Sequence, residues 1–188
     1  MKIIIYISII ITSFLTISCN KENTSVNSKA TSSTKKTIPL PKNLKIIKID
    51  ESFKAPEYTY QNLSLSIPED FKKKEETIFF QENGTNLSIA KELTQSSIDD
   101  YIKKNYKKLK TDYSNTIKEE ENLNINNNLA KHVKYIIDRK KYLIQIETIL
   151  IKKDNYMYII IVSGKKKHID VLSNTINNIF ATIKIKDI

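Results

Sequence analysis

The stretch Tyr156-Met157-Tyr158-Ile159-Ile160-Ile161-Val162 is apolar at all seven positions. An exposed helix or a half-exposed strand would place polar residues on its solvent side, whereas a strand covered on both faces needs none. Gly164 and the cations Lys165 to Lys167 end the run. We therefore expect residues 156–163 to form the central strand of a sheet.

Upstream of this strand, the sequence alternates with a period of two in three segments joined by short polar turns. The segments cover residues 115–124, 129–138 and 142–151. Short turns join neighbouring strands in opposite directions, so the pattern predicts an antiparallel meander. We expect 129–138 and 142–151 to be buried on one face only.

Two helices are predicted around the meander. The first covers residues 97–112, where apolar residues recur at spacings of three and four. Either Ser96 with Asp99 or Ser97 with Asp100 supplies an N-terminal cap and an acid three residues later. The second helix is traced by Ile169, Leu172, Ile176, Ile179 and Phe180, and a last strand at 182–185 follows it.

Strands are also predicted before the first helix. Residues 63–67 alternate, and Pro68 ends the run. Residues 77–81 and 86–90 flank Asn83-Gly84, which favours a tight hairpin turn. The chain is thus predicted to be α+β, with an antiparallel sheet packed with two helices.

Two short motifs resemble the PsbP-like, DcrB-like α/β/α sandwich family. Leu65-Ser66-Ile67-Pro68 followed by Phe71 is similar to the family's opening strand, and Ile179-Phe180-Ala181-Thr182-Ile183 to its closing helix and strand. Asn127 or Asn128 stands where a glycine is common, and asparagine tolerates the left-handed conformation. Covering about residues 58–188, the resemblance implies an α/β/α sandwich and a binding module of the bacterial envelope rather than an enzyme.

The only cysteine, Cys19, directly follows a short apolar segment. Met1-Lys2 precedes Ile3 to Ile17, and Leu15-Thr16-Ile17-Ser18-Cys19 is similar to a lipobox, although Thr16 occupies a position that is usually aliphatic. The segment is shorter than the roughly 20 apolar residues that span a bilayer. We interpret residues 1–18 as a lipoprotein signal peptide and Cys19 as the lipidation site. The alternative is a secreted chain with a free thiol.

Between Cys19 and the predicted domain, the chain is rich in Asn, Thr, Ser and Lys. Such a composition buries too little apolar surface to offset chain entropy. We therefore assign residues 19–56 to a flexible tether and residues 57–188 to a single α+β domain. Residues 44–49 alternate, and either an edge strand or a docking segment fits them.

The formal charge of +10 comes almost entirely from lysine, because only Arg139 among 31 basic residues is an arginine. Nucleic-acid readout favours the bidentate guanidinium group, so no nucleic acid is expected as a partner. We interpret this charge mainly as solvated surface, and attraction to anionic lipid headgroups is the alternative. The predicted first helix carries a lysine face, which comprises Lys103, Lys104, Lys107, Lys108 and Lys110.

No catalytic motif emerges from the remaining candidates. His132 is expected to face solvent opposite Val133 and Tyr135, and His168 follows three lysines. No serine lies in a Gly-x-Ser-x-Gly elbow. Glu119, Glu120 and Glu121 alternate along a strand, which favours a charged edge over a calcium loop. We expect no catalytic residue, metal or cofactor.

These observations lead to one functional hypothesis and one alternative. The hypothesis is a lipid-anchored lipoprotein of the bacterial envelope, on the periplasmic or surface side of the outer membrane, that binds an envelope protein partner without catalysis. It requires a filled core and an exposed apolar or tyrosine patch. The alternative is a carrier of a small apolar ligand, which requires an apolar cavity of a few hundred Å³.

Overall fold

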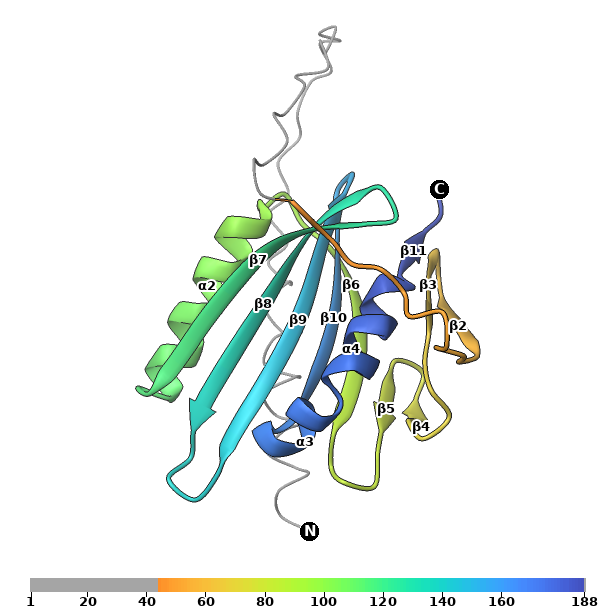
Figure 1. Ribbon diagram of the computed structural model, residues 1–188. Coiled ribbons are helices and arrows are strands. Elements are labelled where there is room, and N and C mark those ends of the chain that lie inside the picture. The colour runs from red at the N-terminus through yellow and green to blue at the C-terminus, as the bar shows by residue number, and fades with distance from the viewer. Residues whose placement is uncertain (1–43, 188) are drawn as a thin grey trace, which may run out of the picture. The chain divides into compact units, whose positions relative to one another are not determined.

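The computed structural model describes residues 44–187, which form two sheets and three helices (Figure 1). The large sheet contains eight strands: β1 (Lys45–Ile46), β4 (Lys72–Glu75), β5 (Ile78–Phe80), β6 (Asn86–Leu93), β7 (Thr116–Ile125), β8 (Asn128–Asp138), β9 (Leu143–Lys153) and β10 (Tyr156–Lys165). The small sheet contains β2 (Glu57–Tyr60), β3 (Leu63–Ser66) and β11 (Lys184–Ile185). The helices are α2 (Ile98–Asp112), α3 (Lys166–Val171) and α4 (Ser173–Ala181). The predicted α+β class is confirmed.

The large sheet has the strand order β1-β7-β8-β9-β10-β6-β5-β4. β7 to β10 form the predicted antiparallel meander, and β10 pairs on its other side with β6. The apolar run in β10 is buried from Met157 to Val162. Its expected place inside the sheet is therefore confirmed, with β9 and β6 on either side.

Helices cover the two faces of this sheet (Figure 1). Ile102 and Leu109 of α2 are buried on one face. On the other face, α4 and the small sheet enclose the main core, in which Ile179 and Phe180 meet Leu65 and Ile149. The residues of the main core lose nearly all contact with water, and this burial is the chief stabilising contribution.

The sequence predicted one sheet and two helices but neither β2 nor β4, and three further details differ. The second predicted helix is divided at Leu172 into α3 and α4. Ile169 and Ile176 keep their helical spacing across the break, so the apolar pattern could not detect it. The last strand, β11, pairs with β3 in a separate sheet. Finally, β9 is buried from Ile144 to Ile151 on both faces, because it lies directly beside the central strand.

Local turn chemistry follows the sequence closely. Gly84 has φ +86°, a conformation that glycine adopts without strain, in the turn between β5 and β6. Asn127 has φ +64° in the turn between β7 and β8, where the related family often has glycine. Ser97 rather than Ser96 caps α2, because its Oγ accepts a hydrogen bond from Asp100 N at 3.1 Å. These residues set where each element begins and turns.

Residues 44–56 approach the edge of the large sheet. Lys45 and Ile46 pair in parallel with Leu123 and Asn124 of β7, so the alternating segment forms an edge strand. Beyond it, Asp50 N donates a hydrogen bond to Asn178 Oδ1 of α4 at 2.7 Å. This interval was assigned to the tether from its composition. Between Leu44 and Asp187, none of the helices has both the length and the apolarity required to cross a membrane.

Candidate functional site

The predicted lipidation site, Cys19, lies outside the described residues, as do the signal peptide 1–18 and residues 19–43 of the tether. Lipidation and the N-terminal boundary therefore remain predictions from sequence. The geometry of residues 44–187 shows what the folded part of the chain offers to a ligand or a partner.

His132 was expected to face solvent, and that expectation is wrong. Its side chain is 17% exposed, and its Nε2 lies 3.1 Å from Glu147 Oε2 on β9. The ring also packs edge-on against Phe180 of α4, with 5.7 Å between the ring centroids. A period of two placed His132 on the correct strand face. It could not show that α4 would cover that face.

Glu147 is the more buried member of this pair, with an exposed side-chain fraction of 8%. Burial by itself raises the pKa of a carboxyl group, but the hydrogen bond and charge of His132 outweigh this and hold the pKa of Glu147 below its ordinary value. Gln145 Nε2 also donates to Glu147 Oε1 at 2.6 Å. The carboxylate is thus held ionised and fixed in position.

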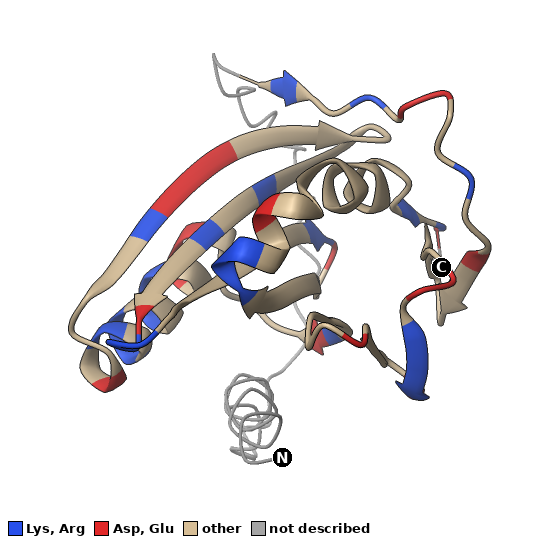
Figure 2. Cartoon of the chain, turned by 60° about the horizontal axis from the view of Figure 1, so that its bottom comes forward, with Lys and Arg blue, Asp and Glu red and all other residues tan. Residues whose placement is uncertain are grey.

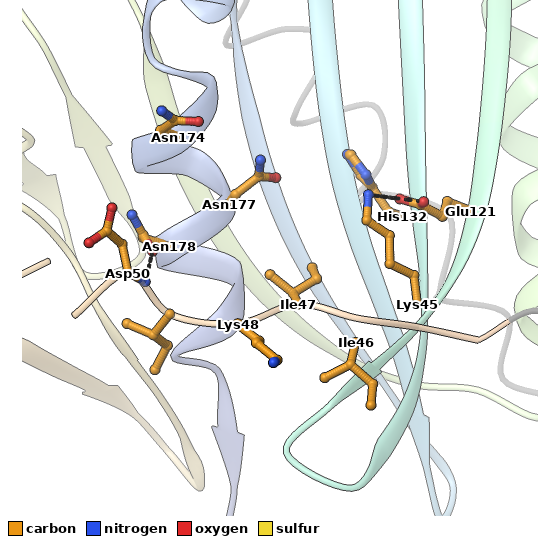
Figure 3. A pocket seen from close by; sticks show the side chains of 11 residues that line it. Lys45, Ile46, Ile47, Lys48, Asp50, Glu121, His132, Asn174, Asn177 and Asn178 are labelled. Atoms are coloured by element: carbon orange, nitrogen blue, oxygen red, sulfur yellow. Dashed lines mark hydrogen bonds and ion pairs between the residues drawn. The ribbon is translucent and has the colours of Figure 1, made fainter. Parts of the chain in front are cut away.

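A pocket of about 430 Å³ opens beside His132 (Figure 3). One wall is the segment around β1, another is the β7–β8 sheet face, and the third is α4. Lys45 Nζ lies 3.1 Å from Glu121 Oε1 in this pocket. The lining residues are Lys45, Ile46, Ile47, Lys48, Ile49, Asp50, Glu121, His132, Asn174, Asn177 and Asn178.

The lining is predominantly polar, and its two lysines are balanced by Asp50 and Glu121. It contains no serine, threonine or cysteine that His132 could activate as a nucleophile. His168 belongs to α3 and does not line the pocket. Among residues 44–187, no three histidine, cysteine or acidic side chains converge on a possible metal position. This pocket does not match the apolar cavity that a carrier of apolar ligands requires.

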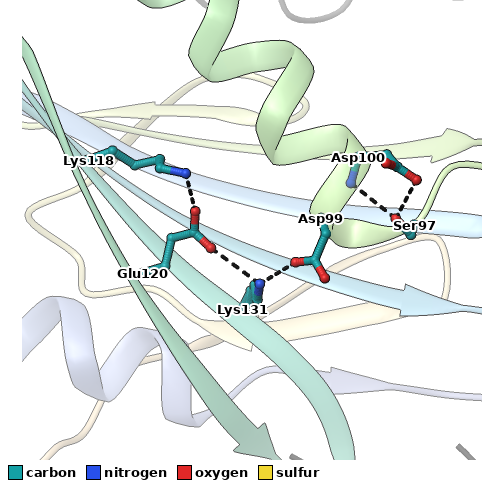
Figure 4. Close-up of polar contacts among 6 residues, drawn as sticks. All are labelled: Ser97, Asp99, Asp100, Lys118, Glu120 and Lys131. Carbon is teal, nitrogen blue, oxygen red and sulfur yellow. Dashed lines mark hydrogen bonds and ion pairs between the residues drawn. The ribbon is translucent and has the colours of Figure 1, made fainter.

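The three adjacent glutamates of β7 point to alternate faces of the sheet, as predicted for a charged edge. Glu119 lies 3.5 Å from Lys134, and Glu121 pairs with Lys45. Glu120 turns to the α2 side, where it pairs with Lys118 and Lys131, and Lys131 also reaches Asp99 (Figure 4). Burial by itself would raise the pKa of Glu120, but the hydrogen bonds from Lys118 and Lys131 outweigh burial, so this pKa lies below its ordinary value. Each glutamate is thus neutralised by lysine.

A second feature is an uncovered part of the large sheet on the face that carries α3 and α4. Ile117 of β7 lies opposite Ile136 of β8, and Asp138 pairs with Leu143 of β9. Ile117 is 59% exposed and Leu143 40% exposed. Figure 1 shows no helix over this end of β7 and β8. We call Ile117, Ile136 and Leu143 the sheet-face patch.

Comparison with solved structures identifies the fold of the chain. No protein-family model matches the sequence, and no curated protein matches it significantly. A solved structure of the cyanobacterial PsbP protein from Synechocystis sp. PCC 6803 matches with a TM-score of 0.50 at 9% identity, covering 74% of this chain and 98% of that one. The chain has a PsbP-like fold.

Two other solved structures share this architecture. A Pseudomonas aeruginosa protein of unknown function matches with a TM-score of 0.52 at 12% identity, covering 71% of this chain and 98% of that one. A Bacteroides thetaiotaomicron protein matches with a TM-score of 0.50 at 11% identity, covering 72% and 50% of the two chains. At such identities the PsbP-like fold is shared, while the task of the protein must be argued from its own residues.

Proposed function

We propose that this chain is a lipid-anchored lipoprotein of the bacterial envelope that binds a protein partner through the sheet-face patch and performs no catalysis. The observation that carries this proposal is the exposure of Ile117 and Leu143 on an uncovered sheet face. Exposed apolar side chains that lie together mark interaction surfaces more often than isolated ones do. The Glu119–Lys134 ion pair beside them supplies a polar rim.

The anchoring part of the proposal rests on Cys19 and the apolar segment before it. Asn20 follows the cysteine, and the absence of aspartate there favours the outer membrane over the inner membrane. The non-enzymatic part is supported by the pocket beside His132, whose lining contains no serine, threonine or cysteine that the histidine could activate. We also propose that the chain is related to the DcrB-like proteins, which its two short motifs resemble.

The proposal is tested by photo-crosslinking in intact cells. A photoreactive residue replaces Ile117 in one variant and Leu143 in a second, and the control variant carries it at Leu93, which is 63% exposed on β6. We expect mass spectrometry to identify the same protein at Ile117 and Leu143, and not at Leu93. Ile136→Asp should abolish its capture.

Two results would count against the proposal. Equal capture at Leu93 would mean that the sheet-face patch has no special role in binding. Capture that is unchanged in Cys19→Ala would mean that anchoring is irrelevant to the partnership. Mass spectrometry of the Cys19 peptide reports the lipid directly, so a failure of the anchor and a failure of the partner surface give different readouts.

A further inference from the structure

Basic side chains gather at one end of the large sheet, where β8 turns into β9 and β10 runs into α3. Lys165 Nζ lies 5.7 Å from the centre of the Tyr142 ring, so the turn and the start of the helix are neighbours. Figure 2 shows basic residues on both elements at this end of the molecule. We define the basic end as Arg139, Lys140, Lys141, Lys165, Lys166, Lys167 and Val171.

The turn between β8 and β9 leaves its lysines exposed. Arg139 stacks on the Tyr113 ring at 3.9 Å and donates a hydrogen bond to the Tyr113 hydroxyl at 2.7 Å. Lys140 adopts φ +64°, and its N–H donates to Asp138 Oδ1 at 2.7 Å. The arginine is thus held against a tyrosine, whereas Lys140 and Lys141 are exposed to solvent.

Among the ion pairs of residues 44–187, only one involves a cation of the basic end. The acids close in sequence to the cations of the basic end are Asp138 and Asp170, and Asp170 pairs with Lys166 at 2.6 Å. Within the described part of the chain, Lys140, Lys141 and Lys167 form no ion pair with an acidic side chain. Three lysines therefore remain available to a negatively charged surface.

An exposed apolar side chain accompanies these charges. Val171 is 84% exposed, the largest exposed fraction among the large hydrophobic side chains of residues 44–187. It follows Lys167 by four residues on α3, so the two side chains share one face of the helix. Burial of an apolar group and attraction of cations to acidic headgroups are the two contributions that hold protein surfaces on membranes.

We propose that the basic end rests on an anionic lipid surface, with Lys140, Lys141 and Lys167 at the lipid phosphates and Val171 at the headgroup boundary. Nucleic acid fits less well, because the only arginine of the chain already engages Tyr113. Lysine binds phosphate as a point charge and suits a diffuse anionic surface. The inference uses the proposed lipid anchor only to bring the domain near a membrane.

The test measures how close the basic end lies to a bilayer. The full-length lipidated protein is carried in vesicles that contain quencher lipids, and a fluorophore is attached at Val171→Cys or, as the control site, at Leu129→Cys. We expect quenching at position 171 to exceed that at 129 several-fold in vesicles containing phosphatidylglycerol. The excess should vanish in pure phosphatidylcholine.

A matched pair of variants separates this surface from the general positive charge. Lys140, Lys141 and Lys167 are changed to glutamine in one protein, and the exposed Lys103, Lys104 and Lys107 of α2 in the other. The first triple variant should lose the excess quenching, and the second should keep it. Equal loss of quenching in both triple variants would overturn the proposal. Equal quenching at positions 171 and 129 would overturn it as well. That second result is expected if the basic end binds an acidic protein or nucleic acid instead of lipid.

The quenching at position 171 can be interpreted whether or not Cys19 carries lipid. Mass spectrometry of the Cys19 peptide shows whether its sulfur carries lipid or label. If it carries no lipid, the same labels are placed in a Cys19→Ser background, so that the introduced thiol is the only one. Quenching at position 171 then reports on the basic end alone.

Discussion

His132 on β8 and Glu147 on β9 are diagonal neighbours in the sheet, with 3.1 Å between Nε2 and Oε2 beneath Phe180. Removal of one partner should leave the other buried without compensation. We expect His132→Phe to lower the free energy of unfolding by roughly 1–3 kcal/mol. Adding Glu147→Leu should restore part of this loss. Urea unfolding of the two single variants and the double variant measures the coupling. Strictly additive losses would show that the pair does not interact.

The same pair predicts a pH dependence. The pKa of Glu147 lies below the ordinary value of 4.5 in the folded chain. The ionised carboxylate therefore stabilises the fold fully above pH 4.5, and this contribution is lost as the pH falls through the lowered pKa. We expect Glu147→Gln to show a shallower loss of stability below pH 4.5 than the unmodified protein. Glu119→Gln, at an exposed position, should retain the original slope, and urea midpoints across pH 3–6 provide the comparison.

The cap of α2 gives a prediction with a closely matched control. Ser97 Oγ accepts a hydrogen bond from Asp100 N, whereas the Ser96 side chain does not cap the helix. We expect Ser97→Ala to lower the free energy of unfolding by about 1 kcal/mol. Ser96→Ala should have less than half of that effect. Similar losses from both substitutions would contradict the assignment of the cap.

The two glycines should respond differently to alanine. A Cβ at Gly164 would lie 3.1 Å from Thr85 Oγ1 and 3.2 Å from Thr85 Cα, so the neighbouring backbone would have to move. Gly84 has no atom within 4 Å of its added Cβ, but its φ of +86° disfavours any residue with a side chain. We expect Gly164→Ala to cost roughly 1–3 kcal/mol from overpacking and Gly84→Ala about 1 kcal/mol from backbone strain.

An asparagine series distinguishes these two causes. Asparagine tolerates positive φ better than alanine does, so Gly84→Asn should recover part of the stability lost in Gly84→Ala. Gly164→Asn should be worse than Gly164→Ala, because a larger side chain meets the same Thr85 backbone. Thermal unfolding of the four variants measures the order. Equal recovery at both positions would rule out the steric explanation for Gly164.

Local pattern was sufficient to predict most elements. The period of two located β7 to β9, the unbroken apolar run located β10, and Asn83-Gly84 located a hairpin. The pattern failed where a third element decides the environment. The partial burial of His132 depends on Phe180 lying across β8, some fifty residues further along the chain. Likewise, the place of β11 in a second sheet depends on β3, more than a hundred residues away.

The candidate surfaces were still harder to predict. Ile117, Ile136 and Leu143 come from three strands, and only the register of β7, β8 and β9 brings them together. A visible signal was present for the basic end, because Lys165 to Lys167 are adjacent in sequence. Their proximity to Tyr142 and the turn at Lys140 still required the fold. Spacing identifies which side of a strand a residue occupies, but not what covers it.

The short strand β1 also determines how the domain would carry a mechanical load. A pull on the chain before Leu44 reaches the two register pairs of β1 with β7 first, and then the Asp50–Asn178 hydrogen bond. Both lie at the edge of the domain, where Ile47 and Phe53 of the same segment pack against the main core from outside, and both should yield before β2 and β3 are strained. Release of residues 44–56 would lengthen the connection to the domain by at most about 45 Å of extended chain. Detachment of β1 would thus lengthen the connection under tension while the rest of the folded domain stays intact.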